Sequence, residues 1–158
     1  MRQKTELSES PQSFTVTKEG QTAVITFYTD VEEEQRGETT AYTAIAWDLR
    51  VPWQEHLEER IGSNQESWFR IAQDAAYSLA SSEVRAVRDK MLADSDASMA
   101  LDRLGLIVPS GSTFTAWLSF LRGLGLVLTG KIALYRQALR DIPQQPGFPY
   151  DIEWPEKP

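Results

Sequence analysis

The sequence Tyr135-Arg-Gln-Ala-Leu-Arg-Asp-Ile142 leads directly into Pro143-Gln-Gln-Pro-Gly-Phe-Pro-Tyr-Asp-Ile-Glu-Trp-Pro-Glu-Lys-Pro158. The first stretch has the apolar spacing of an amphipathic helix, and Pro143 ends that helix because proline cannot continue one. Further prolines recur at short intervals, and each biases the residue before it toward extended backbone. Residues 143–158 are therefore predicted to form a stiff, mostly extended C-terminal arm that presents large apolar side chains.

The N-terminal part is predicted to form a small antiparallel β-meander. Phe14 and Val16 alternate with threonines, and a turn at Lys18–Gln21 separates them from the apolar run Thr22–Tyr28. This is the pattern of a hairpin with one buried face. Thr39–Val51 alternates again and supplies a third strand. The whole chain is expected to have an α+β fold, in which the meander is followed by a helical region and the arm.

The segments around these strands are expected to be irregular or helical. Residues 1–12 are polar and are predicted to be loose, and the acidic run Asp30–Glu34 is predicted to be a turn or long loop. Pro52 suits the first turn of a helix, which would cover Trp53–Ile61 and end at Gly62. Residues 1–62 then form the first predicted domain.

A longer helix is predicted from Ser63, because Ser63 and Glu66 have the spacing of a capping box. We expect a bend at Ser81–Glu83 and an end near Asp94–Asp96. The side chains expected on its buried stripe have the helical spacing of one face and are Trp68, Ile71, Ala72, Ala75, Ala76 and Leu79.

Two further helical segments are predicted within a helical domain of residues 63–142. The first is Ser98–Leu104, and the second is Thr113–Asp141, in which the glycines indicate either close packing or a break near Gly123–Gly125. The apolar run 114–128 within it is shorter than the ~20 residues that span a bilayer, and Arg122 interrupts it. The sequence therefore favours a buried or partner-facing helix over a membrane-spanning one.

Composition excludes several classes of function. The chain has 158 residues, 16 basic against 23 acidic, and a net charge of −7. An acidic surface repels phosphate backbones, so nucleic acid is not an expected partner. The absence of cysteine excludes disulfides and thiolate metal sites. The polar N-terminus does not resemble a signal peptide, and the sequence leaves homo-oligomerisation open.

No catalytic, cofactor or metal site is predicted. The segment 125–132 approaches the phosphate-binding loop motif, but Ile132 lacks the hydroxyl that binds magnesium and no strand precedes the segment. His56 is the single histidine, whereas a zinc site needs several nitrogen or sulfur ligands.

The C-terminal helix and arm are instead predicted to bind a partner protein. Aromatic side chains carry a large share of interface energy, and two arginines four residues apart lie on one helical face. The arginines would pair with acidic groups on the partner. The predicted partner-binding residues are Tyr135, Arg136, Leu139, Arg140, Phe148, Tyr150, Ile152 and Trp154. The alternative is that Phe148 and Trp154 fold back on the helix and close the domain.

The same residues carry a family resemblance. The chain resembles the phage tail assembly chaperone family in four segments, which occur in the family's order: Lys90–Asp96, Tyr135–Ile142, Gly147-Phe-Pro149 and Ile152–Pro158. The C-terminal segments are also similar to the C-terminus of tail-fibre assembly proteins. The chain departs from the family pattern by an apolar insertion, Leu104–Leu134.

The resemblance implies a non-enzymatic assembly chaperone whose partner is a phage tail or tail-fibre protein. It would act in the host cytoplasm. The alternative left open is a structural virion protein, such as a tail-fibre adaptor or baseplate accessory component, which would reside in the virion tail.

Overall fold

The computed structural model describes residues 1–36, 39–96, 104–111 and 113–158. The chain forms two compact units, Met1–Ala80 and Ser81–Pro158. Each unit is described by itself below. The predicted division into residues 1–62, 63–142 and 143–158 stays a prediction.

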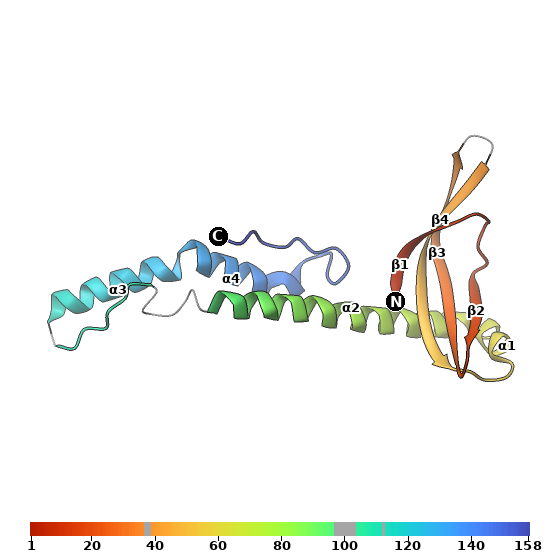
Figure 1. The fold of residues 1–158 in the computed structure, drawn as a ribbon, viewed down its shortest axis with the longest axis horizontal. Coiled ribbons are helices and arrows are strands. Elements are labelled where there is room, and N and C mark those ends of the chain that lie inside the picture. The colour runs from red at the N-terminus through yellow and green to blue at the C-terminus, as the bar shows by residue number, and fades with distance from the viewer. Residues whose placement is uncertain (37–38, 97–103, 112) are drawn as a thin grey trace. The chain divides into compact units, whose positions relative to one another are not determined.

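The first unit contains a four-stranded antiparallel sheet in the order β1-β4-β3-β2 (Figure 1). This sheet, together with the helices, confirms the predicted α+β class. The hairpin between β2 and β3 turns at Gly20, whose φ of 65° lies in the left-handed region that glycine adopts without strain. The strands are β1 (Arg2–Leu7), β2 (Phe14–Glu19), β3 (Thr22–Arg36) and β4 (Thr39–Pro52).

The expectation that residues 1–12 are loose was wrong for β1. This strand pairs with β4 from Arg2 opposite Trp47 to Leu7 opposite Tyr42. The sequence shows little apolar alternation there, because β1 is an edge strand whose side chains are mostly exposed. Its place in the sheet comes from backbone hydrogen bonds, which any residue except proline can form.

The acidic run Asp30–Glu34 is also part of a strand rather than a turn or long loop. It lies in β3, where Glu32 pairs with Thr43 and Glu33 with Tyr42. The register shifts between Thr29 and Glu32, and Asp30 there has a φ of 50°. A bulge of this kind lets a strand continue past an irregular residue.

The core of the first unit lies on one face of the sheet. Ile25 and Phe27 of β3 are fully buried or nearly so, and the ring of Phe27 lies 5.6 Å from that of Phe69. Trp47 packs edge-on against the same Phe69 ring. The buried residues of this core are Ala23, Ile25, Phe27, Leu49, Leu57, Ile61 and Ala72.

The helix boundaries near residue 60 differ from those predicted. Pro52 is the last residue of β4, and helix α1 covers Leu57–Gly62. The Ser63 side chain does not cap the next helix, because its hydroxyl donates to the Arg60 carbonyl at 3.0 Å. Helix α2 begins two residues later, at Gln65.

Helix α2 covers Gln65–Asp96 without the bend predicted at Ser81–Glu83. Of its predicted buried stripe, Ala72 and Ala76 are buried and Trp68 is partly buried. Ile71 and Leu79 are about half exposed, and Ala75 is exposed, so that part of the prediction was wrong. The reason is that the core of the first unit takes only Trp68, Phe69 and Ala72 from this helix.

The second unit contains α3 (Phe114–Leu128), α4 (Lys131–Asp141) and the short 3-10 helix η2 (Ile142–Gln144). The predicted helical region is therefore two segments, but they separate at Thr129–Gly130 rather than at Gly123–Gly125. The alternative of close packing holds for Gly123, which lies against the Leu106 side chain. The helix predicted at Ser98–Leu104 lies almost wholly outside the described residues.

No single helix within the described ranges is long and apolar enough to cross a membrane. The pair Phe114–Val127 and Lys131–Gln144 meets the length and composition criteria together, with a bend of 47° between its halves.

Candidate partner-binding surface of the C-terminal segment

The predicted partner-binding residues lie on and around a small core in the second unit. Tyr135, Leu139 and Ile142 are buried on one side of α4 and η2. Apolar residues that pack against them come from α2 and from the C-terminal segment, and they are Val84, Met91, Leu92, Phe148 and Ile152. The spacing of Tyr135 and Leu139 placed them on one face of the helix, and this face turns inward.

The C-terminal segment was predicted to be a stiff, mostly extended arm, but it begins with a 3-10 helix and a tight turn. It turns sharply at Gly147, whose carbonyl accepts hydrogen bonds from the backbone N–H groups of Tyr150 and Asp151, both at 2.8 Å. A Cβ atom added to Gly147 would lie 2.1 Å from the Asp151 carbonyl oxygen. The turn therefore requires a residue without a side chain at this position. The Phe148–Pro149 peptide bond within it is cis.

After the turn, the chain runs back beside α4 and ends near the junction of α3 and α4 (Figure 1). The side-chain amide of Gln145 fixes the start of this return. It donates to the Glu153 carbonyl at 2.9 Å and accepts from the Glu153 N–H at 3.0 Å. Residues 152–158 have no helix or strand of their own, and Pro158 lines a pocket with Val127 and Gly130.

Arg136 is engaged inside its own unit. Its guanidinium lies 2.8 Å from the Asp96 carboxylate and donates to the Leu92 carbonyl at 3.0 Å. It also donates to the Ser95 hydroxyl. The side chain is only 14% exposed. We had expected Arg136 to pair with acidic groups of a partner, but in this structure three groups at the end of α2 occupy it.

Three of the predicted residues present their side chains on the surface. Arg140 is exposed at the end of α4, and Tyr150 and Trp154 are 39% and 37% exposed. Phe148 lies between these and the core, with the Arg85 guanidinium 5.6 Å from its ring centroid. Partner binding by the eight residues stays a prediction, and the structure brings all of them together in one unit.

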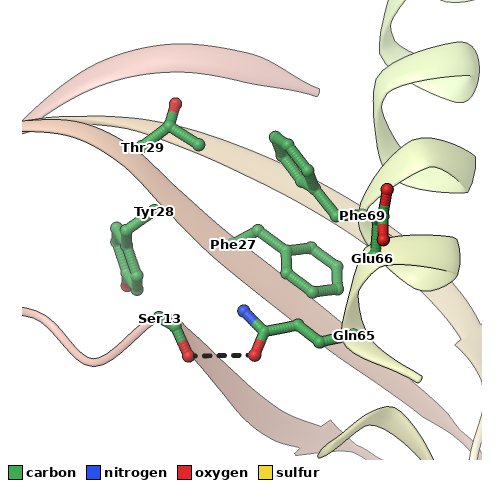
Figure 2. A pocket seen from close by; sticks show the side chains of 7 residues that line it. All are labelled: Ser13, Phe27, Tyr28, Thr29, Gln65, Glu66 and Phe69. Carbon is green, nitrogen blue, oxygen red and sulfur yellow. Dashed lines mark hydrogen bonds between the residues drawn. The ribbon is translucent and has the colours of Figure 1, made fainter.

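Sequence reasoning did not single out an open pocket of about 390 Å³ in the first unit. Figure 2 shows the aromatic side chains of Phe27 and Phe69 beside it, with Ser13 and Gln65 joined by a hydrogen bond of 3.3 Å. Tyr28, Thr29 and Glu66 complete its lining. The pocket depends on how the start of α2 meets the sheet, and no local pattern in the sequence signals that contact.

The single histidine, His56, lies on the surface. The Nδ1 atom of His56 lies 3.4 Å from Glu59, and both side chains are more than two-thirds exposed. No group of three or more histidine, aspartate or glutamate side chains in the described ranges is placed to hold a metal ion.

Comparison with known proteins finds a similarity, and it lies in the C-terminal segment. No curated protein and no solved structure matches the chain. The sequence model of the family described as phage tail assembly chaperone protein matches residues 128–158. This range holds α4, the turn at Gly147 and the returning segment. The match therefore confirms the resemblance to the phage tail assembly chaperone family for the C-terminal segment, and it supports a general role in tail assembly.

Proposed function

We propose that the protein is a non-enzymatic assembly chaperone that binds a phage tail or tail-fibre protein through α4 and its C-terminal segment. The observation that carries the proposal is where the family match lies in the structure. It covers residues 128–158, which include α4, the turn at Gly147 and the exposed Tyr150 and Trp154. These residues also supply the buried side chains Tyr135, Leu139 and Ile142 of the small core, against which Val84, Met91 and Leu92 of α2 pack.

The surface of this element suits protein binding. Tyr150 and Trp154 offer aromatic area beside the exposed charge of Arg140, and interface hot spots are enriched in these three residue types. Unassembled fibrous proteins expose strand edges and apolar surface that promote aggregation. A protein that covers such surface raises the yield of assembly without a chemical step.

The inward-facing residues have a part in this proposal as well. Tyr135, Leu139, Phe148 and Ile152 form the contact between α4 and the returning segment. If a client displaces that segment, the same side chains become available to it. The segment would then be both a lid on the α4 face and a binding element.

A structural role in the virion is the second candidate. It is favoured by the exposed apolar side chains of α3, where Phe114 is 77% and Leu126 is 75% exposed. Permanent assemblies bury more apolar surface than transient ones do.

Quantitative mass spectrometry of intact particles and of the lysate that produced them separates these two candidates. A chaperone is expected to be abundant in the lysate and missing from the particles. A fixed copy number per particle would contradict the chaperone proposal and support the structural role.

The binding surface has its own test in a complementation assay for infectious particles. The double variant Tyr150→Ala with Trp154→Ala is expected to lower the particle titre at least about tenfold, since hot-spot residues are each worth about 2 kcal/mol. Gln144→Ala, at an exposed position of η2, serves as the control. An unchanged titre with the double variant would exclude this surface.

A further inference from the structure

The described surface of the second unit has an apolar stripe along α3. We define the α3 stripe as Phe114, Trp117, Leu118 and Leu121, which recur at the i, i+3, i+4 and i+7 spacing of one helical face. Their exposed fractions are 77%, 40%, 36% and 57%. Four large apolar side chains in one row exceed the scattered exposure that a soluble surface normally shows.

The opposite face of α3 is partly covered by the loop before the helix. The loop before the helix lies along it, and a Cβ atom on Gly123 would come within 2.8 Å of the Leu106 side chain. The Trp117 indole N–H donates to the Gly111 carbonyl at 2.8 Å, which ties the loop to the helix. The loop therefore lies against the opposite face at Gly123 and reaches the stripe at the Trp117 indole N–H, while the four stripe side chains stay exposed.

Gly125 adds an independent observation on the stripe side of the helix. It follows Leu121 by four residues, and a Cβ atom there would meet no described atom within 4 Å. Glycine in a helix is less favourable than alanine by about 1 kcal/mol. Contacts within the described chain explain Gly123 but not Gly125. A glycine on an exposed helical face gives a partner backbone room to approach closely.

The charge of this region indicates what the partner carries. Residues 103–140 contain no aspartate or glutamate, although the chain as a whole has a net charge of −7. The exposed charged side chains among the described residues of this range are all basic, namely Arg122, Lys131 and Arg140, while Arg136 is paired with Asp96. Arg122 directly follows Leu121 and is exposed at the border of the stripe. A complementary partner supplies carboxylates beside its apolar surface.

We propose that the α3 stripe binds an amphipathic helix of a tail protein, whose apolar ridge is flanked by aspartate or glutamate. Helix-on-helix packing suits the i, i+3, i+4 and i+7 anchors, and Gly125 lets the two backbones approach. The identification of the partner as a tail protein rests on the function proposed above. The amphipathic and acidic character of the partner helix is inferred from the α3 stripe and Arg122 alone.

Two other occupants fit the observations less well. The first is a second copy of the chain. Arg122 lies next to the midpoint of α3, so antiparallel pairing of two α3 helices would bring the two Arg122 side chains close together. Their like charges would repel each other. A helix lying in a membrane surface carries a charged face opposite its apolar face. In α3 that position is taken by the uncharged residues Ala116, Phe120 and Gly123, which line a pocket together with the loop before the helix.

The test uses the full chain and two labelled synthetic helices of about 18 residues, long enough to be helical in isolation. Both peptides have the same leucine ridge, and the ridge is flanked by glutamate in one and by lysine in the other. Fluorescence anisotropy is expected to show at least about tenfold tighter binding of the glutamate peptide. Leu121→Asp is expected to reduce that binding at least tenfold, whereas Leu134→Asp, at an exposed position of α4, leaves it unchanged.

The charge-swap variant Arg122→Glu keeps the fold and reverses the preference, so that the lysine peptide binds more tightly than the glutamate peptide. Gly125→Ala is expected to raise the Tm of the free chain by about 2–4 °C while it weakens peptide binding. A merely structural role for these residues would produce neither result.

Equal binding of the two peptides, or no binding, would overturn the proposal. Binding to phosphatidylcholine–phosphatidylglycerol vesicles in place of the peptides, or a dimer in sedimentation equilibrium that Leu121→Asp dissolves, would overturn it in favour of a membrane or a second copy. The Tyr150→Ala, Trp154→Ala double variant separates this proposal from the function proposed above. It is expected to lower the particle titre and to leave peptide binding intact.

Discussion

The guanidinium of Arg136 and the carboxylate of Asp96 lie 2.8 Å apart and join α4 to the end of α2. The same guanidinium donates to the Leu92 carbonyl, one helical turn before Asp96, and to the hydroxyl of Ser95, the residue just before Asp96. Arginine suits such a site because its planar group presents several donors in fixed directions. The pair therefore contributes to holding the family-matched segment against α2.

Arg136→Ala is expected to lower the free energy of unfolding by about 2 kcal/mol, since hydrogen bonds to a charged group are worth roughly that amount. Urea unfolding followed by circular dichroism measures the change. Arg140→Ala, which removes an exposed arginine of the same helix, is the control and should stay within about 0.5 kcal/mol. Equal effects of the two variants would show that the Arg136 contacts contribute nothing.

Leu139→Ala is expected to destabilise the chain by about 3 kcal/mol, because the side chain is fully buried and its removal leaves a cavity. Leu134→Ala makes the same chemical change on the same helix at a position that is 64% exposed. The midpoint of urea unfolding should be clearly lower for Leu139→Ala than for Leu134→Ala. If they coincide, the inward orientation of the Leu139 face is wrong.

Gly147→Ala is expected to destabilise the turn by about 2 kcal/mol, because the added methyl group would collide with the Asp151 carbonyl. Limited proteolysis of residues 143–158 should accelerate at the same time. Gly62→Ala provides the control, since a Cβ atom there meets no described atom within 4 Å. A Gly147 variant as resistant to protease as the unaltered chain would contradict the tight turn.

Gln145→Ala removes both hydrogen bonds to the backbone of Glu153. With each bond worth about 1 kcal/mol, exchange of the Glu153 amide hydrogen should become at least roughly tenfold faster. Hydrogen exchange followed by NMR measures this at the single residue. Gln144→Ala should leave the rate unchanged, and a Glu153 rate that does not respond to Gln145→Ala would show that the amide contact does not hold the segment.

The part of the fold that followed from sequence was the part set by local pattern. Alternation at Phe14 and Val16 identified β2, and the glycine at position 20 marked the turn that follows. Strand β1 was not predicted, because its place in the sheet depends on pairing with β4, a contact across about 40 residues of chain. Such non-local backbone pairing leaves no periodicity in the strand itself.

The candidate site shows the same limit. Helical spacing correctly grouped Tyr135 with Leu139 on one face, but periodicity identifies a face without saying what covers it. The cover is the chain's own Phe148 and Ile152. The return of that segment depends on Gly147 and Gln145, whose roles are visible only once Asp151 and Glu153 are in place.

The long hairpin of β3 and β4 has a consequence for the behaviour of the protein at high concentration. In the described residues, β2 pairs with β3 only as far as Phe27, and β1 covers β4 only between Tyr42 and Trp47. The hairpin continues beyond both as a two-stranded ribbon (Figure 1).

A bare ribbon of this kind is a template for adding strands from other copies, and strands stacked in that way lie about 4.8 Å apart. Here the edge of β3 that β2 leaves uncovered carries Asp30, Glu32, Glu33 and Glu34, the last of which begins the two-stranded part. Any copy that added to it in register would bring rows of carboxylates into contact, and their mutual repulsion opposes fibril growth. We therefore expect the acidic run to oppose the addition of strands from other copies at this edge.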